Sequence, residues 1–402
     1  MAKIILFFQA VILLFGCQSF GKRKVVSEWK VLENADNLTC SDWPQSPKDL
    51  NIQKIQILKG DQVGFVSEVL QRNGSKQYYF SEYEGGVKIE PNDLEDRSFG
   101  SSSLLAGGGY FDNQLQAVVV VNGEKNKSRL EIRSMKDNVI RFSTADNLKN
   151  VQTASSYNTR SGLWMLYKTP QDDTSETELT NSVYYVPIDS KSQKSSFESF
   201  KNSSFPPQAQ MLLPNKGQDA FVVWPSDEKD KKVFTLSMQQ LQSKNSQVTP
   251  TRKVDLPLRF ELESWAAAAT AEGIYVAYVD GNSLVGQAVL SVAMIRWNDG
   301  APLLNWSKES MLTNEHVSIP IWSTAKNDQL YVMLPKWVDE ESTIATYKVS
   351  SQGIEEKKVK GIFEKGIRIM DTFYDNSNDK LVAMLRQKGR LGWDFKLCEL
   401  SL

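Results

Sequence analysis

Short apolar segments recur along the chain at a nearly constant interval, and this spacing dominates its hydrophobic pattern. One type of segment begins near residues 63, 115, 163, 220, 274, 330 and 381, a mean step of about 53 residues. A turn signal rich in Gly, Asn or Asp precedes each segment. The segments are almost continuously apolar, as expected for strands that are buried on both faces. The pattern therefore predicts a repeated strand unit.

Two further strands accompany each apolar segment. The strand after it alternates in polarity, as in residues 129–133 (RLEIR), which suits a more peripheral strand with one solvated face. The strand before it is often built from small residues, as in the four alanines at 266–269. Small side chains are expected where several inner strands crowd around one axis.

Four-stranded units repeated seven times, with no helical periodicity between them, predict an all-β fold, a seven-bladed β-propeller. An elongated array of β-sandwiches is the alternative. The chain ends favour the ring, because the last unit ends on its third strand and segment 25–33 is a strand without a unit. We expect 25–33 to join the C-terminal blade, which removes an open edge. The expected blades cover about residues 51–92, 101–145, 150–202, 207–256, 262–311, 316–362, and 366–402 plus 25–33.

The N-terminal segment has the pattern of an export signal. Lys3 precedes the apolar stretch 4–15, which is shorter than the roughly 20 residues that span a bilayer. Residues 14–17 (LFGC) resemble a bacterial lipobox, although Phe15 stands where a small or aliphatic residue is usual. The resemblance implies cleavage before Cys17 and attachment of diacylglycerol to its thiol. Plain secretion, with Cys17 inside the removed peptide, is the alternative.

The lipobox resemblance divides the chain into a signal peptide (1–16), a lipidated tether (17–24) and a single propeller domain (25–402). Two or three acyl chains make a stable anchor, whereas one does not. Gln18 follows the cysteine, where an Asp would indicate retention in the inner membrane. We therefore expect an exported protein that is lipid-anchored to the bacterial outer membrane, and its periplasmic or surface orientation stays open.

The remaining cysteines lie at the two ends of the expected ring. Cys398 is on the last strand, and Cys40 follows the expected closing strand by a few residues. In an oxidising compartment they can form a disulfide that locks the ring, provided that their Cα atoms approach within about 7 Å. Two buried free thiols are the alternative.

Composition excludes several classes of protein. The 47 Lys and Arg against 48 Asp and Glu give a net charge of −1, without the basic excess that marks a nucleic-acid-binding surface. One histidine and three cysteines cannot build the usual structural zinc cluster. The chain contains no phosphate loop, hydrolase elbow or zinc-protease motif. We therefore expect no metal and no cofactor.

The unit around residues 265–280 resembles the repeats of sialidase-type propellers, and residues 297–300 (WNDG) are similar to the Asp-box turn of that group. The resemblance covers one blade well and implies the propeller fold. The reaction of that family uses an arginine cluster, a tyrosine nucleophile and an acidic partner. Arg160, Arg259 and Arg368 stand at the ends of expected inner strands, but no motif assigns these roles to them.

Several polar residues stand near the starts of inner strands, positions that point to one mouth of a propeller channel. Carboxylates there suit a glycosidase-type acid pair or a cation site. A solvated channel lining is the alternative, and for the histidine a structural role. These candidate binding residues are Arg259, Glu261, Glu263, His316, Arg368 and Asp371.

Long charged loops between the second and third strands open on the same face. Trp337 lies in one of them and is the candidate partner anchor, because tryptophan is enriched at interface hot spots; folding onto its own blade is the alternative. We expect a non-catalytic cell-envelope lipoprotein whose propeller is a binding scaffold for a protein partner, in contact with membrane through its lipid only. A glycan-binding or glycan-cleaving propeller is the alternative.

Overall fold

The structure is a computed structural model of the 402-residue chain. Its described residues are all-β, and none of them forms a helix that is long and apolar enough to cross a bilayer. The structure describes residues 38–42, 52–58, 64–70, 76–82, 103–111, 114–122, 127–134, 140–143, 148–149, 151, 153–159, 162–170, 179–187, 198–200, 204–214, 219–226, 233–244, 247–282, 287–298, 300–312, 316–317, 322–326, 329–338, 341–357, 362–364, 368–375, 378–388 and 393–401.

The described strands form seven antiparallel sheets, numbered here in chain order. Sheet one contains β2 (Ile52–Leu58), β3 (Gly64–Leu70) and β4 (Lys76–Glu82). Sheet two contains β5 (Ser103–Phe111), β6 (Gln114–Asn122), β7 (Lys127–Ser134), β8 (Ile140–Ser143) and β9 (Leu148–Lys149). Sheet three contains β10 (Thr153–Thr159), β11 (Gly162–Pro170), β12 (Leu179–Pro187) and β13 (Glu198–Ser199).

The second half of the chain forms the other four sheets. Sheet four contains β14 (Gln210–Leu212), β15 (Ala220–Pro225), β16 (Val233–Gln242), β17 (Gln247–Val248) and β18 (Arg252–Pro257). Sheet five contains β19 (Glu261–Ala269), β20 (Ile274–Asn282), β21 (Gln287–Asn298) and β22 (Ala301–Leu312). Sheet six contains β23 (His316–Val317), β24 (Trp322–Lys326), β25 (Gln329–Val338), β26 (Glu341–Ser350), β27 (Gly353–Lys357) and β28 (Ile362–Glu364). Sheet seven contains β29 (Arg368–Asp375), β30 (Lys380–Lys388), β31 (Trp393–Ser401) and β1 (Leu38–Asp42).

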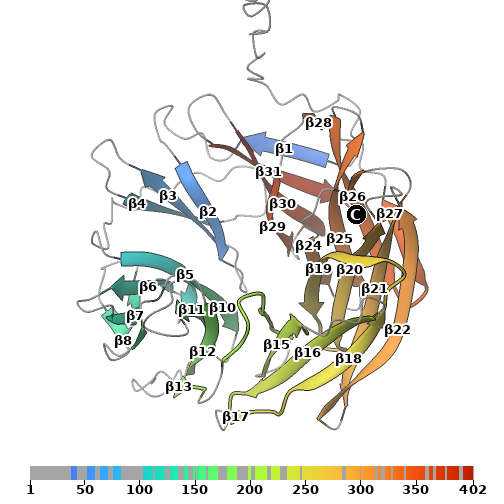
Figure 1. Cartoon of the computed structure of the whole chain (residues 1–402). Helices are drawn as coiled ribbons and strands as arrows, with labels where there is room; N and C mark the ends of the chain where they lie inside the picture. The colour runs from blue at the N-terminus through green and yellow to red at the C-terminus, as the bar shows by residue number, and fades with distance from the viewer. Residues whose placement is uncertain are drawn as a thin grey trace, which may run out of the picture.

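The sheets are arranged around a common centre, as Figure 1 shows. The first strands of neighbouring sheets touch one another, including β2 with β5, β5 with β10, β14 with β19, β19 with β24 and β24 with β29. Each sheet therefore runs outward from a first strand near the axis to its last strand at the rim. This is the arrangement of a β-propeller, and the all-β propeller fold class predicted from the sequence repeat is confirmed.

The second strand of a sheet is buried on both faces, as its continuous apolar pattern predicted. In β20, Val276 packs with Val223 and other residues of sheet four, whereas Ala277 on the opposite face packs with Val332 of sheet six. All of these side chains are fully buried. Because burial of apolar surface contributes about 25 cal/mol per Å², sheet five is held mainly by its two neighbours.

An N-terminal strand completes sheet seven. β1 pairs antiparallel with β31, and Cys40 stands directly opposite Cys398. The two cysteines form a disulfide, with their Cα atoms 4.1 Å apart. This arrangement corrects the expectation that 25–33 takes the outer edge of the last sheet. Residues 38–42 occupy that edge because the disulfide lies at the centre of their ladder, and 25–33 lies outside the described residues.

The first and last sheets also pack against each other. Ile57 and Phe65 of sheet one form one apolar cluster with Phe373 and Val382 of sheet seven. The rings of Phe65 and Phe373 meet edge to face, with their centroids 6.0 Å apart. Sheet one is therefore joined to sheet seven by apolar packing, and β1 is joined to β31 by backbone pairing and a disulfide.

Candidate functional site

The candidate mouth residues come from three consecutive sheets. Because β19, β24 and β29 contact one another in succession, the backbone of these sheets brings the candidates to one sector of the ring. Arg259, Glu261 and Glu263 lie just before or within β19 of sheet five, His316 lies in β23 of sheet six, and Arg368 and Asp371 lie in β29 of sheet seven.

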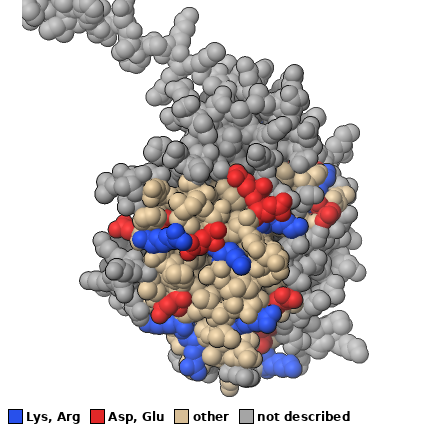
Figure 2. Space-filling model, turned by 90° about the vertical axis from the view of Figure 1, so that its right-hand side faces the viewer, with Lys and Arg blue, Asp and Glu red and all other residues tan. Residues whose placement is uncertain are grey.

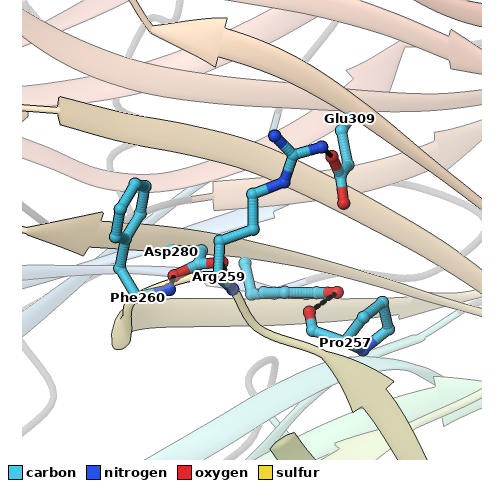
Figure 3. A network of polar contacts seen from close by, with 6 residues as sticks. Pro257, Arg259, Phe260, Asp280 and Glu309 are labelled. Carbon is cyan, nitrogen blue, oxygen red and sulfur yellow. Dashed lines mark hydrogen bonds and ion pairs between the residues drawn. The ribbon is translucent and has the colours of Figure 1, made fainter. Parts of the chain in front are cut away.

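A buried carboxylate organises the sheet-five part of this sector. Asp280, near the end of β20, is only 1% exposed. One of its oxygens accepts the backbone N–H of Phe260 at 2.7 Å, and the other accepts the backbone N–H of Arg259 (Figure 3). The Tyr278 hydroxyl donates to the carbonyl of Pro257 at 2.8 Å. Together these bonds fasten the connection from sheet four to sheet five onto β20.

The guanidinium of Arg259 is engaged at the rim. It donates to and forms an ion pair with Glu309 of β22, the outermost strand of sheet five (Figure 3). The Arg259 side chain is 59% exposed and that of Glu309 31%, so the pair contributes at most about 1 kcal/mol to stability. A carboxylate-binding role for Arg259 at the mouth would require this contact to break.

Glu263 is placed by a β-bulge. The pairing of β19 with β20 skips from Leu262 to Ser264, so that Glu263 is the extra residue. A bulge re-aims a side chain and often occurs beside a functional site. The Glu263 carboxyl lies against Gly281, where a Cβ atom would come within 2.2 Å of its oxygen. Partial burial, with a smaller contribution from the charge of Asp280, raises the pKa of Glu263.

The same irregularity recurs at the starts of other first strands. The pairing skips one residue between Ile52 and Lys54 in β2, between Leu105 and Gly107 in β5, and between Ile369 and Asp371 in β29. These bulges change which way the following side chains point, and sequence analysis did not identify them. Side chains alternate with a period of two along a strand, and this alternation does not show where one extra residue is inserted.

Sheet six forms an extended hairpin at this end of the ring. β24 pairs with the lower part of β25, up to Met333, whereas β23 pairs with its upper part at Lys336 and Trp337. On the other side, β28 pairs with the upper part of β26, from Glu341 to Thr343. The hairpin therefore continues beyond the inner strand, with a backbone partner on each side.

The hairpin brings two predicted residues together. His316, a candidate channel residue, and Trp337, the candidate partner anchor, stand directly opposite each other in the ladder between β23 and β25. They are 21 positions apart in the sequence, and the sequence pattern pointed to them for different reasons. The register places both at the same height on the sheet-six hairpin.

The candidates in sheet seven occupy different surroundings. Arg368 stands directly opposite Arg386 in the pairing of β29 with β30. Asp371 is partly exposed and accepts the backbone N–H of Thr372 at 2.7 Å. In the part of the chain that the structure describes, there is no group of three or more His, Cys, Asp and Glu residues that could hold a metal ion.

The tryptophans near the Asp-box-like turn serve the core. Trp297 meets Phe221 of sheet four with ring centroids 5.3 Å apart, and Trp306 meets Tyr275 at 5.9 Å. Gly300 in the same turn has a φ of 76°, the left-handed conformation that favours glycine. These residues stabilise the fold. Arg160, the third arginine named with this resemblance, and Cys17 of the lipobox lie outside the described residues.

The known proteins that resemble this chain do so in structure, at low sequence identity. No protein-family model and no curated protein matches the chain. Among solved structures, the chain is 12% identical to an acylaminoacyl peptidase from Pyrococcus horikoshii over 89% of its own length and 52% of that chain, with a TM-score of 0.47. It thus spans about half the length of that peptidase, and it covers 49% of a second acylaminoacyl peptidase.

Two further structures are covered almost completely. A protein from Listeria monocytogenes is 11% identical over 88% of this chain and 93% of its own, with a TM-score of 0.47. The β-propeller domain of the Trilobed protease from Pyrococcus furiosus is 12% identical over 87% of this chain and 93% of its own, with a TM-score of 0.45.

Proposed function

We propose that the protein is a seven-bladed β-propeller, with its ring closed by β1, that serves as a non-catalytic binding scaffold for a protein partner at the bacterial cell envelope. Seven sheets among the described residues and the contacts between sheets one and seven support this ring. The Cys40–Cys398 disulfide supports export to an oxidising compartment. It uses two of the three cysteines and leaves Cys17 for the lipid anchor.

The observation that carries the binding proposal is the supported hairpin of sheet six. Its upper part has a backbone partner on each side, β23 and β28. Because association costs less entropy when the binding surface is already ordered, such a hairpin is suited to present a contact surface. Trp337 stands in this part, and tryptophan is enriched among residues that dominate binding energy. The proposed partner surface is therefore the top of β25 and β26.

The charges of sheet five support a non-catalytic role. Asp280 holds two backbone N–H groups and Arg259 is paired with Glu309, so these groups serve the architecture. At the rim that faces the viewer in Figure 2, basic and acidic residues are interspersed over a largely uncharged surface. Interspersed charge suits a protein partner better than a polyanion such as nucleic acid.

One observation favours the alternative, a glycan-binding or glycan-cleaving propeller. The raised pKa of Glu263, next to Asp280, is what a general acid in a carboxylate pair requires. Against this, the two backbone donors to Asp280 hold it as a structural acceptor. Glu263→Gln abolishes glycan cleavage if the alternative holds, and leaves partner binding unchanged if the scaffold proposal holds.

The test is affinity capture of the tagged, lipidated protein from its own membranes, with mass spectrometry of what co-elutes. Trp337→Ala removes the proposed anchor. Met311→Ala, at a 55% exposed position of β22 on the rim, is the matched control. We expect a stoichiometric partner with the wild type and with Met311→Ala, and its loss with Trp337→Ala. Retention of the partner by Trp337→Ala, or a wild type that captures nothing, contradicts the proposal.

A further inference from the structure

The first described strand fixes the face of the ring to which the N-terminal segment is joined. β1 begins at Leu38, which stands opposite Leu400 in the ladder with β31. Because β31 ends at Ser401, this is the end of sheet seven that lies away from the turn between its second and third strands. We name this side of the ring the anchor face, because the segment that carries Cys17 directly precedes Leu38.

The proposed partner surface lies at the opposite face. Trp337 is near the end of β25, next to the turn between the second and third strands of sheet six. Sheets six and seven have the same orientation, because Tyr331 near the start of β25 stacks on Tyr374 near the end of β29, with ring centroids 6.2 Å apart. Trp337 therefore stands at the end of the ring that is remote from Leu38.

The hairpin of β21 and β22 extends further toward the anchor face than the same hairpin of sheets four and six. At this end, the last pair between β20 and β21 is Ile274 with Ile295, and β21 continues for three residues that pair with β22. In sheets four and six, the third strand continues for one residue past the corresponding pair, to Gln242 and Ser350. We name residues 296–298 and 300–303 the sheet-five tip.

The sheet-five tip combines an exposed apolar side chain with a basic one. Leu303 is 58% exposed, the highest fraction among the large apolar side chains that the structure describes. Arg296 stands directly opposite it in the ladder and is also exposed. Lys244 is exposed beside the corresponding turn of sheet four, and Glu272, before β20, adds an exposed acidic residue. An apolar side chain near basic ones suits the boundary of lipid headgroups and acyl chains.

The length of chain between the ring and the lipidation site favours a bilayer as the occupant of this surface. Twenty residues separate Cys17 from Leu38, and they can span at most about 70 Å. A lipid on Cys17 therefore keeps the anchor face near the bilayer. An apolar contact at that face then orients the ring, which the chain between Cys17 and Leu38 does not do by its length alone.

We propose that the anchor face rests on the lipid bilayer, with Leu303 inserted at the level of the headgroups, and that the surface around Trp337 is presented away from the membrane. This inference rests on the proposed lipid anchor at Cys17. It adds a lipid surface as a second binding partner. The protein partner then approaches from the side of the ring that is remote from the bilayer.

Fluorescence quenching in vesicles tests this orientation. The lipidated protein is placed in vesicles of phosphatidylethanolamine and phosphatidylglycerol that contain a lipid with a nitroxide on its headgroup. The lipid occupies the thiol of Cys17 and the other two native cysteines are bonded to each other, so only an introduced cysteine takes the fluorophore. Ala301→Cys reports on the sheet-five tip, and Val338→Cys reports on the top of β25. We expect strong quenching at 301 and weak quenching at 338.

Leu303→Asp tests the contact itself. Because burial of a leucine side chain is lost and a charge is added, we expect the equilibrium between contact and separation to shift by about tenfold or more, with loss of quenching at 301. Met311→Asp is the matched control, at a 55% exposed position near the other end of the same strand. This control should leave the quenching at 301 unchanged.

Flotation of the same vesicles reports on the lipid anchor separately. Protein that floats with equal quenching at 301 and 338, or with quenching that Leu303→Asp does not change, overturns the membrane contact and leaves the anchor proposal standing. A label at 301 that is shielded from aqueous iodide but not quenched by the lipid assigns the tip to a second copy of the chain, and also overturns it. Protein that does not float contradicts the anchor proposal and this inference with it.

Discussion

Two regions at the same end of the ring use their polar residues in opposite ways. In sheet five, Asp280 and Arg259 are engaged in hydrogen bonds and an ion pair within the fold. In sheet six, the upper part of the hairpin pairs through its backbone with β23 on one side and with β28 on the other. The comparison teaches that a charged mouth is not by itself a binding site. Charged residues there can serve the fold itself, as Asp280 and Arg259 do.

Removal of Asp280 should give the largest effect on stability. Asp280→Ala leaves the partly buried N–H groups of Arg259 and Phe260 without this acceptor, which we expect to cost about 2–4 kcal/mol in the free energy of unfolding. Asp280→Asn keeps a carbonyl acceptor and should cost less. Urea unfolding of the three proteins measures this. An Asp280→Ala variant as stable as the wild type breaks the structural interpretation of sheet five.

Removal of Trp337 should affect partner binding much more than folding stability. Trp337→Ala is expected to weaken partner binding by about 2 kcal/mol or more, because the proposed anchor is lost. Folding stability should change little if the hairpin is supported by its backbone. Calorimetric titration with the captured partner, together with a thermal melt, measures both. A variant that unfolds readily, yet binds normally when folded, would show that Trp337 stabilises the fold and does not anchor the partner.

The ion pair between Arg259 and Glu309 should contribute little. Both side chains are partly exposed, so Arg259→Ala is expected to cost less than about 1 kcal/mol, and less still at high salt. Chemical unfolding at low and at high ionic strength measures the difference. The backbone N–H of Arg259 still reaches Asp280 in this variant. A cost comparable to that of Asp280→Ala would show that the guanidinium has a larger role.

Glu263 should make the smallest contribution, visible only as a dependence on pH. Its pKa is raised in the folded state, first by burial and then by the charge of Asp280. The folded protein therefore binds this proton more tightly than the unfolded chain does, and stability from this group falls as pH rises through its unfolded pKa of about 4.3 and past the folded value. Glu263→Gln should remove that fall in unfolding measured from pH 4 to pH 7.

Gly281→Ala is the matched variant for this pH dependence. Its added Cβ would displace the Glu263 carboxyl from its position, which should return the pKa of Glu263 toward its usual value. We expect the pH dependence of Gly281→Ala to resemble that of Glu263→Gln. A wild-type dependence retained in both variants would assign it to another group.

Much of the fold could be predicted because burial leaves a signal in the sequence. The second strands, such as β20, are apolar on both faces, and the turn before each one is marked by Gly, Asn or Asp. The closing strand could not be predicted in the same way. Segment 25–33 has the stronger strand pattern, whereas Leu38–Asp42 is short and polar and is held by its partner β31 and the disulfide. Such tertiary contacts do not appear in local pattern.

The candidate site shows a similar limit. Sequence placed Glu261, Glu263 and Arg259 near the start of β19, and the structure agrees in position. It did not identify Asp280, although a charged residue at the end of a long apolar strand is a signal for a buried, hydrogen-bonded carboxylate. The bulge at Glu263 depends on the pairing of β19 with β20, which local sequence does not show. Position along the chain is predictable here, and the use of each side chain is not.

The most direct test of the central claim is site-specific photo-crosslinking in native membranes. A photoreactive amino acid at Val338, at the top of β25, samples the proposed partner surface, and one at Met311 on the rim is the control. We expect one discrete adduct of defined mass from position 338 and none from 311. An adduct from 311 without one from 338 would contradict it.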